Sequence, residues 1–123
     1  MTKITAHEFG ETIRRLRMER EITLRKFAEM VGLSPTFISM LERGEFEPPS
    51  EENIRIIARA LHQNEDEFVA LAGRISEEWK AVIRENPREM ADFLRTAKNL
   101  TKEDLSKLTK QAVRMSEKNQ EEQ

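Results

Sequence analysis

Residues 31–50 hold side chains whose types and spacing suit contact with a nucleic acid. Four of them recur at intervals of three and four, which places them on one face of a helix: Thr36, Ser39, Met40 and Arg43. Small and polar side chains let a helix backbone approach the floor of the major groove of DNA, which is about 12 Å wide. The predicted chemistry is therefore readout of base edges by contact, without bond making or breaking.

The residues around this stripe predict two short helices joined by a tight turn. Thr23 and Ser34 are residue types that cap a helix N-terminus, and Pro35 suits a first helical position, where its missing N–H costs nothing. Gly32 suits the left-handed backbone that ends many helices. Ala28 is small enough for the two helices to cross closely. The stripe is thus expected on the second helix of the pair, facing outward.

Apolar residues recur at intervals of three and four along the whole chain, which predicts an all-α protein with eight helices. We expect the first helix to begin at a capping box from Thr5 to Glu8 and to end near Arg20. After the helix pair, further helix starts are expected at Ser50, Asn64, Ser76, Pro87 and Thr101.

Composition argues against several other classes of protein. Of the 123 residues, 37% are hydrophobic and 36% are charged, and no apolar run reaches the ~20 residues that a membrane span needs. The N-terminus lacks an apolar signal core, so we expect a cytoplasmic protein. There is no cysteine, and the two histidines have no partner at ligand spacing, so we expect no metal and no cofactor. Without a Ser-His-Asp set or a glycine-rich phosphate loop, an enzyme is not expected.

The chain resembles the Xre class of phage-repressor and Cro-like helix-turn-helix regulators over the segment TLRKFAEMVGLSPTFISMLERG, with FGETIRRLR before it and PPSEENIRIIARAL after it. The resemblance covers roughly residues 7–73 and implies a five-helix domain that binds double-stranded DNA. It favours a binding role for the stripe over an ordinary solvent-exposed helix face. It also implies that Arg17 and Glu42 form an ion pair that braces the first helix against the third.

The resemblance implies two sets of DNA contacts. Base edges would be contacted by Pro35, Thr36, Ser39 and Met40. Because Met40 cannot make a bidentate hydrogen bond, we expect it to touch a thymine methyl group. The resemblance implies phosphate contacts by Ser34 and Arg43. Because the chain departs from the family pattern at two places, we expect further phosphate contacts from Arg25, Lys26, Arg14 and Arg15.

Two features depart from the family pattern. Leu24 stands where the family usually has a glutamine that holds a phosphate. The loop after the recognition helix reads Glu45-Phe46-Glu47, where the family is often basic. With a net charge of -2 for the whole chain, phosphate contact would depend on a local basic face. We therefore expect modest affinity for DNA per monomer.

Residues 1–73 are expected to bind DNA, and residues 74–115 carry a further set of apolar positions at helical spacing. These positions would either complete the core of a single domain or form contacts between chains. Contact between chains is favoured because five helices already close the DNA-binding unit in this family. The expected dimerisation residues are Trp79, Val82, Ile83, Met90, Phe93, Leu94, Leu105, Leu108 and Met115. Residues 116–123 contain no apolar residue and are expected to be disordered.

The resulting hypothesis is a homodimeric repressor that binds an inverted-repeat operator through the major groove. The alternative is an antitoxin, or a regulator controlled by a companion protein such as a toxin or a metallopeptidase. In that case the C-terminal helices would bind the companion instead of a second copy of the chain.

Overall fold

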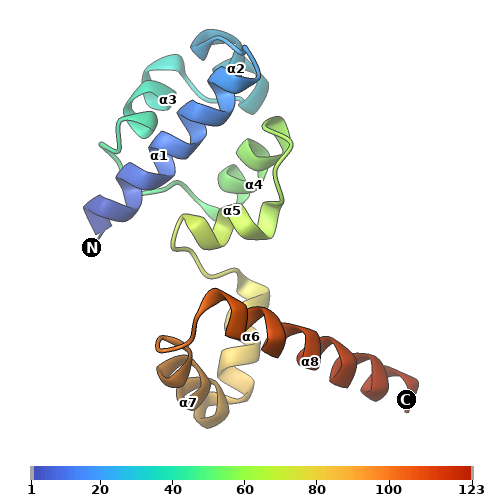
Figure 1. Cartoon of the computed structure of the whole chain (residues 1–123). Helices are drawn as coiled ribbons and strands as arrows, with labels where there is room; N and C mark the ends of the chain where they lie inside the picture. The colour runs from blue at the N-terminus through green and yellow to red at the C-terminus, as the bar shows by residue number, and fades with distance from the viewer. Residues whose placement is uncertain (1, 123) are drawn as a thin grey trace. The chain divides into compact units, whose positions relative to one another are not determined.

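The computed structural model describes the backbone of residues 2–122 and the side chains of residues 6–122. In this part of the chain all regular secondary structure is α-helical (Figure 1). The helices are α1 (Thr2–Glu19), α2 (Leu24–Val31), α3 (Pro35–Glu42), α4 (Glu51–Ala60), α5 (Glu65–Leu71), α6 (Glu77–Glu85), α7 (Pro87–Ala97) and α8 (Lys102–Glu121). The prediction of an all-α protein is confirmed.

The helices divide between two compact units, Met1–Glu77 and Glu78–Gln123. We expected the boundary directly after Gly73. Arg74 instead donates hydrogen bonds to the loop that precedes α4, and Ser76 is buried, so both residues belong to the first unit. The first unit therefore extends to the start of α6.

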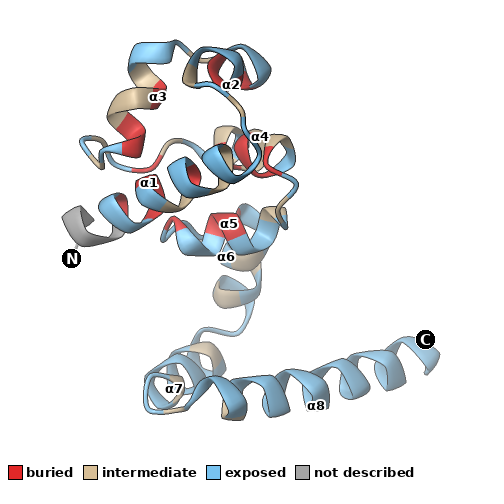
Figure 2. Ribbon diagram, turned by 45° about the horizontal axis from the view of Figure 1, so that its top comes forward, coloured by how far each residue is buried: buried red, intermediate tan, exposed pale blue. Residues whose placement is uncertain are grey.

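The core of the first unit is built from the apolar faces of α1–α5, as the buried positions in Figure 2 show. α1 packs on α3, α2 packs on α3 and α4, and α4 packs on α5. Phe9 of α1 meets Phe68 of α5 edge to face, with 5.8 Å between the ring centroids. Burial of each large apolar side chain stabilises the fold by about 1.5–3 kcal/mol. The fully buried side chains include Phe9, Ile13, Phe27, Ile38, Leu41, Ile54, Ile57, Leu61 and Val69.

The helix starts predicted from capping residues are confirmed at α2, α3, α4, α5 and α8. In each case the cap side chain accepts a hydrogen bond from the backbone N–H three residues later, as Thr23 does from Lys26 at 3.1 Å. At α8 the bonds are reciprocal, because Asp104 accepts from the backbone N–H of Thr101 and Thr101 accepts from that of Asp104.

Two predicted chain segments differ from the structure. The predicted start at Thr5 is wrong, because α1 begins at Thr2 and residues 2–4 contain no helix breaker. Residues 116–123 were predicted to be disordered, whereas α8 runs to Glu121, and Gln123 lies outside the described residues. This tail is rich in Glu, Lys and Gln, which have high helix propensity, and extending an existing helix costs far less than nucleating one.

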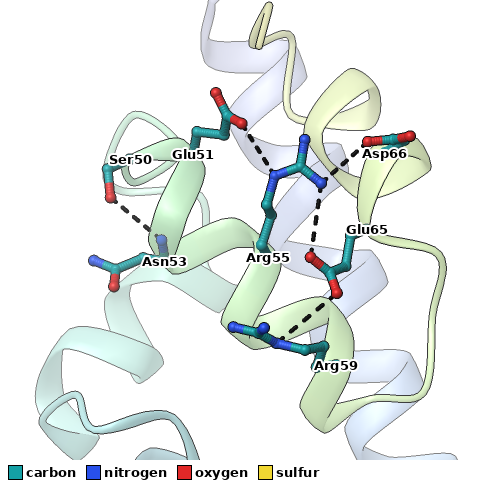
Figure 3. Close-up of polar contacts among 7 residues, drawn as sticks. All are labelled: Ser50, Glu51, Asn53, Arg55, Arg59, Glu65 and Asp66. Atoms are coloured by element: carbon teal, nitrogen blue, oxygen red, sulfur yellow. Dashed lines mark hydrogen bonds and ion pairs between the residues drawn. The ribbon is translucent and has the colours of Figure 1, made fainter. Parts of the chain in front are cut away.

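An ion-pair network joins α4 to the first turn of α5 (Figure 3). Arg55 of α4 lies 3.0 Å from Glu51 on the same helix and 3.0 Å from Asp66 on α5. Glu65 lies 3.7 Å from Arg55 and 3.9 Å from Arg59. Hydrogen bonds to Glu51 and to Asp66 raise the pKa of Arg55, so this side chain is charged throughout the physiological pH range. The network fixes α5 against α4 beside the core contact at Phe68.

The second unit leaves its apolar side chains accessible to solvent (Figure 2). None of the described residues of α6, α7 and α8 is buried. The exposed large apolar side chains of these helices are Val82, Phe93, Leu94, Leu105, Leu108, Val113 and Met115. No described helix of either unit is long and apolar enough to cross a membrane.

Gly10 marks the close crossing of α1 and α3. A Cβ atom at Gly10 would lie 2.3 Å from the carbonyl oxygen of Leu41 and 2.7 Å from that of Glu42, so the helices would have to separate. We expect Gly10→Ala to lower the free energy of unfolding by about 1–3 kcal/mol, although alanine has the better helix propensity by roughly 1 kcal/mol. Urea unfolding measures this change, with Glu11→Ala at the exposed neighbour as control. An unchanged or increased stability would contradict the close crossing.

Candidate nucleic-acid interface

The turn between α2 and α3 has the geometry that its sequence predicts. Gly32 adopts the left-handed conformation with φ 72°, and the N–H of Leu33 donates to the carbonyl oxygen of Ala28 at 3.0 Å. Ser34 then caps α3 by accepting from the backbone N–H of Phe37 at 3.1 Å. Because both helix ends are satisfied by these bonds, the angle between α2 and α3 is set locally.

A buried ion pair holds α3 against α1. Arg17 donates from Nε and Nη2 to the two carboxylate oxygens of Glu42, at 2.8 and 3.0 Å. Its Nη1 donates to the carbonyl oxygen of Ile22, before α2, at 2.8 Å. The two side chains are only 12% and 5% exposed, so each charge depends on the other for compensation. The structure thus brings together the two residues for which the resemblance implied a pair.

The predicted stripe lies on the side of α3 that faces away from the core. Ile38 and Leu41 on the opposite side are fully buried. Exposure on the outward side is high for Ser34, Pro35, Thr36 and Arg43, and intermediate for Ser39 and Met40. The structure therefore keeps the predicted base-contacting residues together and accessible on one surface.

Arg43, at the end of the stripe, is bound by neighbouring side chains. Its Nε and Nη2 donate to Oε2 of Glu45 at 3.1 and 2.9 Å, and its Nη1 donates to Oγ of Ser39 at 3.1 Å. Sequence reasoning treated Glu45 only as a repulsive charge near DNA. The sequence signals for these bonds were short spacings. Ser39 lies four residues before Arg43, and Glu45 lies two residues after it.

The loop after α3 is held by two contacts that the sequence did not indicate. The rings of Phe37 and Phe46 stack, with centroids 5.3 Å apart and 22° between the planes. Arg74 donates from its guanidinium to the carbonyl oxygens of Pro48 and Pro49. The loop that carries Glu45 is consequently fixed at both ends.

Basic side chains lie beside the start of α2 and on the outer surface of α1. Arg14, Arg25 and Lys26 are exposed and form no ion pair within residues 6–122, whereas Arg15 lies 3.1 Å from Glu19. A hollow of ≈ 280 Å³ is lined by Arg14, Arg17, Leu24, Ser39, Glu42 and Arg43. Arg17 binds Glu42 and Arg43 binds Glu45, so Arg14 is the lining arginine that forms no ion pair within residues 6–122 and is available to a phosphate of the DNA backbone.

Comparison with known proteins assigns the first unit. Residues 13–68 match the family HTH_3, which is described as helix-turn-helix. The chain carries an Xre-like helix-turn-helix domain. The family predicted from the sequence is thus confirmed. Its members are DNA-binding regulators of transcription and not enzymes.

Two curated relatives match the helix-turn-helix domain. The HTH-type transcriptional repressor RghR of Bacillus subtilis (strain 168) is 36% identical over 69 residues, which cover 56% of this chain and 51% of RghR. The uncharacterized HTH-type transcriptional regulator RghRB of the same strain is 33% identical over 67 residues, which cover 54% of this chain and 48% of RghRB. This chain therefore spans about half the length of the curated relatives it matches.

The fold of the helix-turn-helix domain resembles that of a solved structure from Vibrio cholerae, and a second solved structure shares sequence similarity. An HTH_3 family transcriptional regulator from Vibrio cholerae is 24% identical with a TM-score of 0.50, over 57% of this chain and 39% of that chain. The clp gene regulator ClgR from C. glutamicum is 30% identical with a TM-score of 0.49, over 56% of this chain and 88% of that chain.

The residues predicted to form a dimer interface lie outside the helix-turn-helix domain, in α6–α8. Trp79, Ile83 and Met90 are half-buried, and the others are exposed. A groove of ≈ 530 Å³ between α7 and α8 is lined by Phe93, Leu105, Leu108, Thr109, Gln111, Ala112 and Met115. Three of the predicted α8 residues and one of the predicted α7 residues therefore share one apolar groove.

The ion pair predicts a large effect of Arg17→Ala on the stability of the helix-turn-helix domain. The change leaves the buried carboxylate of Glu42 without its partner, and breaking such a pair costs about 3–5 kcal/mol. Thermal and urea unfolding measure the loss. Arg15→Ala, which removes an exposed pair with Glu19, is the matched control and should change stability by less than about 1 kcal/mol. Equal melting temperatures for the two variants would contradict the bracing role of Arg17.

Proposed function

We propose that this chain is a sequence-specific DNA-binding regulator that acts as a homodimeric repressor of transcription. The observation that supports this most strongly is the outward stripe on α3. α3 is held by the cap at Ser34 and by the ion pair of Glu42 with Arg17, while its outer surface remains accessible. A rigid helix with small and polar outward side chains fits the major groove. The relative RghR is named a transcriptional repressor, which supports repression as the sign of regulation.

In this proposal α3 lies in the major groove and the basic side chains contact the DNA backbone. The base-facing residues are Pro35, Thr36, Ser39 and Met40. The phosphate-facing residues are Ser34, Arg14, Arg15, Arg25 and Lys26. Arg43, the remaining residue of the predicted phosphate set, already binds Glu45 and is less available to a phosphate.

The second unit supports association of two chains. Its apolar side chains are not buried within α6–α8, and burial of each in an interface is worth about 1.5–3 kcal/mol. A symmetric pair would place two α3 helices about 34 Å apart, or a multiple of that distance, which corresponds to whole turns of DNA. The matching operator is an inverted repeat. A dimer that binds both half-sites at once also has a higher total affinity, which compensates for a modest affinity of each monomer.

The groove between α7 and α8 supports a second candidate, which is control by a companion protein. Its lining is mainly apolar and includes Phe93, Leu108 and Met115. A groove of this kind receives the apolar face of an amphipathic helix. A toxin or a regulatory peptidase that supplied such a helix would make this chain an antitoxin or a partner-controlled regulator.

Met40→Ala and Arg25→Ala should change DNA binding in different ways. Met40 faces the bases, so its loss should relax preference at one operator position by about 1–3 kcal/mol. Arg25 faces a phosphate, so its loss should weaken binding to every sequence and reduce the salt slope by about one. The operator comes from selection among random duplexes, and fluorescence anisotropy at several salt concentrations gives the affinities.

Met18→Ala, at an exposed methionine of α1 outside the predicted contact set, is the control for both measurements. Equal weakening of all sequences by Met40→Ala would contradict its contact with a base. An unaltered salt slope for Arg25→Ala would contradict its contact with a phosphate.

The double variant Phe93→Glu/Leu94→Glu should be monomeric and bind the full operator more weakly, because it places charges in the proposed dimer interface. Light scattering after size exclusion gives the mass. Met18→Glu introduces a charge at an exposed apolar residue of the first unit and should leave the dimer intact. A monomeric wild-type protein would refute the homodimer and favour the companion-protein candidate.

A further inference from the structure

Arg43, the last residue of the outward stripe, is bound to Glu45 and Ser39, but some of its N–H donors form no bond to them. A guanidinium group has five N–H donors in a rigid planar fork. Nε and Nη2 each use one donor on Glu45, and Nη1 uses one on Ser39. Two donors remain, one on each terminal nitrogen of the guanidinium.

The position of Glu45 is set by its neighbours in the loop. Its N–H donates to the carbonyl oxygen of Met40 at 3.0 Å, directly after Gly44 with its left-handed φ of 72°. Phe46, the next residue, stacks on Phe37 of α3. The backbone of Glu45 is therefore held at the end of α3, which places its carboxylate within reach of Arg43.

We propose that Arg43 reads a guanine in the major groove and that Glu45 and Ser39 are positioning residues for this contact. The inference rests on the proposed function, which is DNA binding through α3. One free N–H donor on each terminal nitrogen can serve the two acceptors of guanine, O6 and N7, and this bidentate pairing is the commonest specific contact of arginine with a base. The bonds to Glu45 and Ser39 orient the guanidinium before DNA is bound, which favours a base with both acceptors.

The charge of Glu45 separates this role from a phosphate contact. A carboxylate 2.9 Å from Nη2 offsets the positive charge of Arg43 and repels a phosphate nearby. The acceptor atoms of guanine carry no formal charge and are repelled less. The pair of Arg43 and Glu45 thus favours a base edge over the DNA backbone.

The test compares the full-length wild-type protein with Glu45→Gln on the operator selected from random duplexes and on a scrambled duplex. Glutamine keeps the size of the side chain and removes its charge, and an exposed ion pair contributes little to stability, so the variant should fold. We expect Glu45→Gln to lower the ratio of operator to non-operator affinity about tenfold and to broaden preference at one guanine position. Arg43→Ala should broaden the same position. Non-operator binding by Glu45→Gln should tighten, with a salt slope steeper by about one.

Glu47→Gln is the matched control, because it removes the same charge from the same loop and Glu47 forms no ion pair within residues 6–122. It should leave the affinity ratio and the guanine preference unchanged. Equal tightening of operator and non-operator by Glu45→Gln would overturn the proposal, since Glu45 would then only compete with DNA for Arg43. If the wild-type protein selects no sequence from random duplexes, both the proposed function and this inference would be refuted. If the wild-type protein selects an operator and Glu45→Gln prefers the same bases to the same degree, this inference alone would be refuted.

Discussion

The outward stripe of α3 depends on the buried ion pair between Arg17 and Glu42. One guanidinium group donates to both carboxylate oxygens at the end of α3 and to the backbone carbonyl of Ile22 before α2. Three segments of the chain are therefore joined through a single side chain. Because both charges are almost fully excluded from water, neither is stable in this position without the other. The direction of the outward stripe follows from this contact and from the close crossing of the helices at Gly10.

The two units use their apolar residues in opposite ways. In the first unit, large side chains such as Phe9 and Phe27 are fully buried, and five short helices form a complete core. In the second unit, α6–α8 have apolar faces of similar composition, but none of their described residues is buried. Contiguous apolar surface in water is unfavourable and is typical of interaction sites. One short chain thus joins a helix-turn-helix unit with a buried core to a second unit whose apolar side chains are accessible to solvent.

Sequence patterns alone were enough to predict the all-helical fold, the capped starts of most helices, the turn at Gly32 and the helix-turn-helix domain. These features depend on interactions within a few residues, such as a hydroxyl group at Ser34 that bonds to the N–H of Phe37. They leave a periodic or positional signature that is readable without coordinates. The start of α1 and the end of α8 differ from the prediction for a related reason. Helix extension is cooperative, so a helix can continue beyond a capping signal or through a tail without apolar residues.

Only the tertiary structure decided which partner each exposed or loop side chain takes. The short spacing from Arg43 to Glu45 permits an ion pair but does not specify it, and no sequence signal indicated that Phe46 stacks on Phe37 or that Arg74 bonds to the loop before α4. These contacts depend on the path of an irregular loop after Gly44 and on side-chain directions, which have no fixed period. The same holds for the accessibility of α6–α8, because an amphipathic pattern predicts an apolar face but not the surface that covers it.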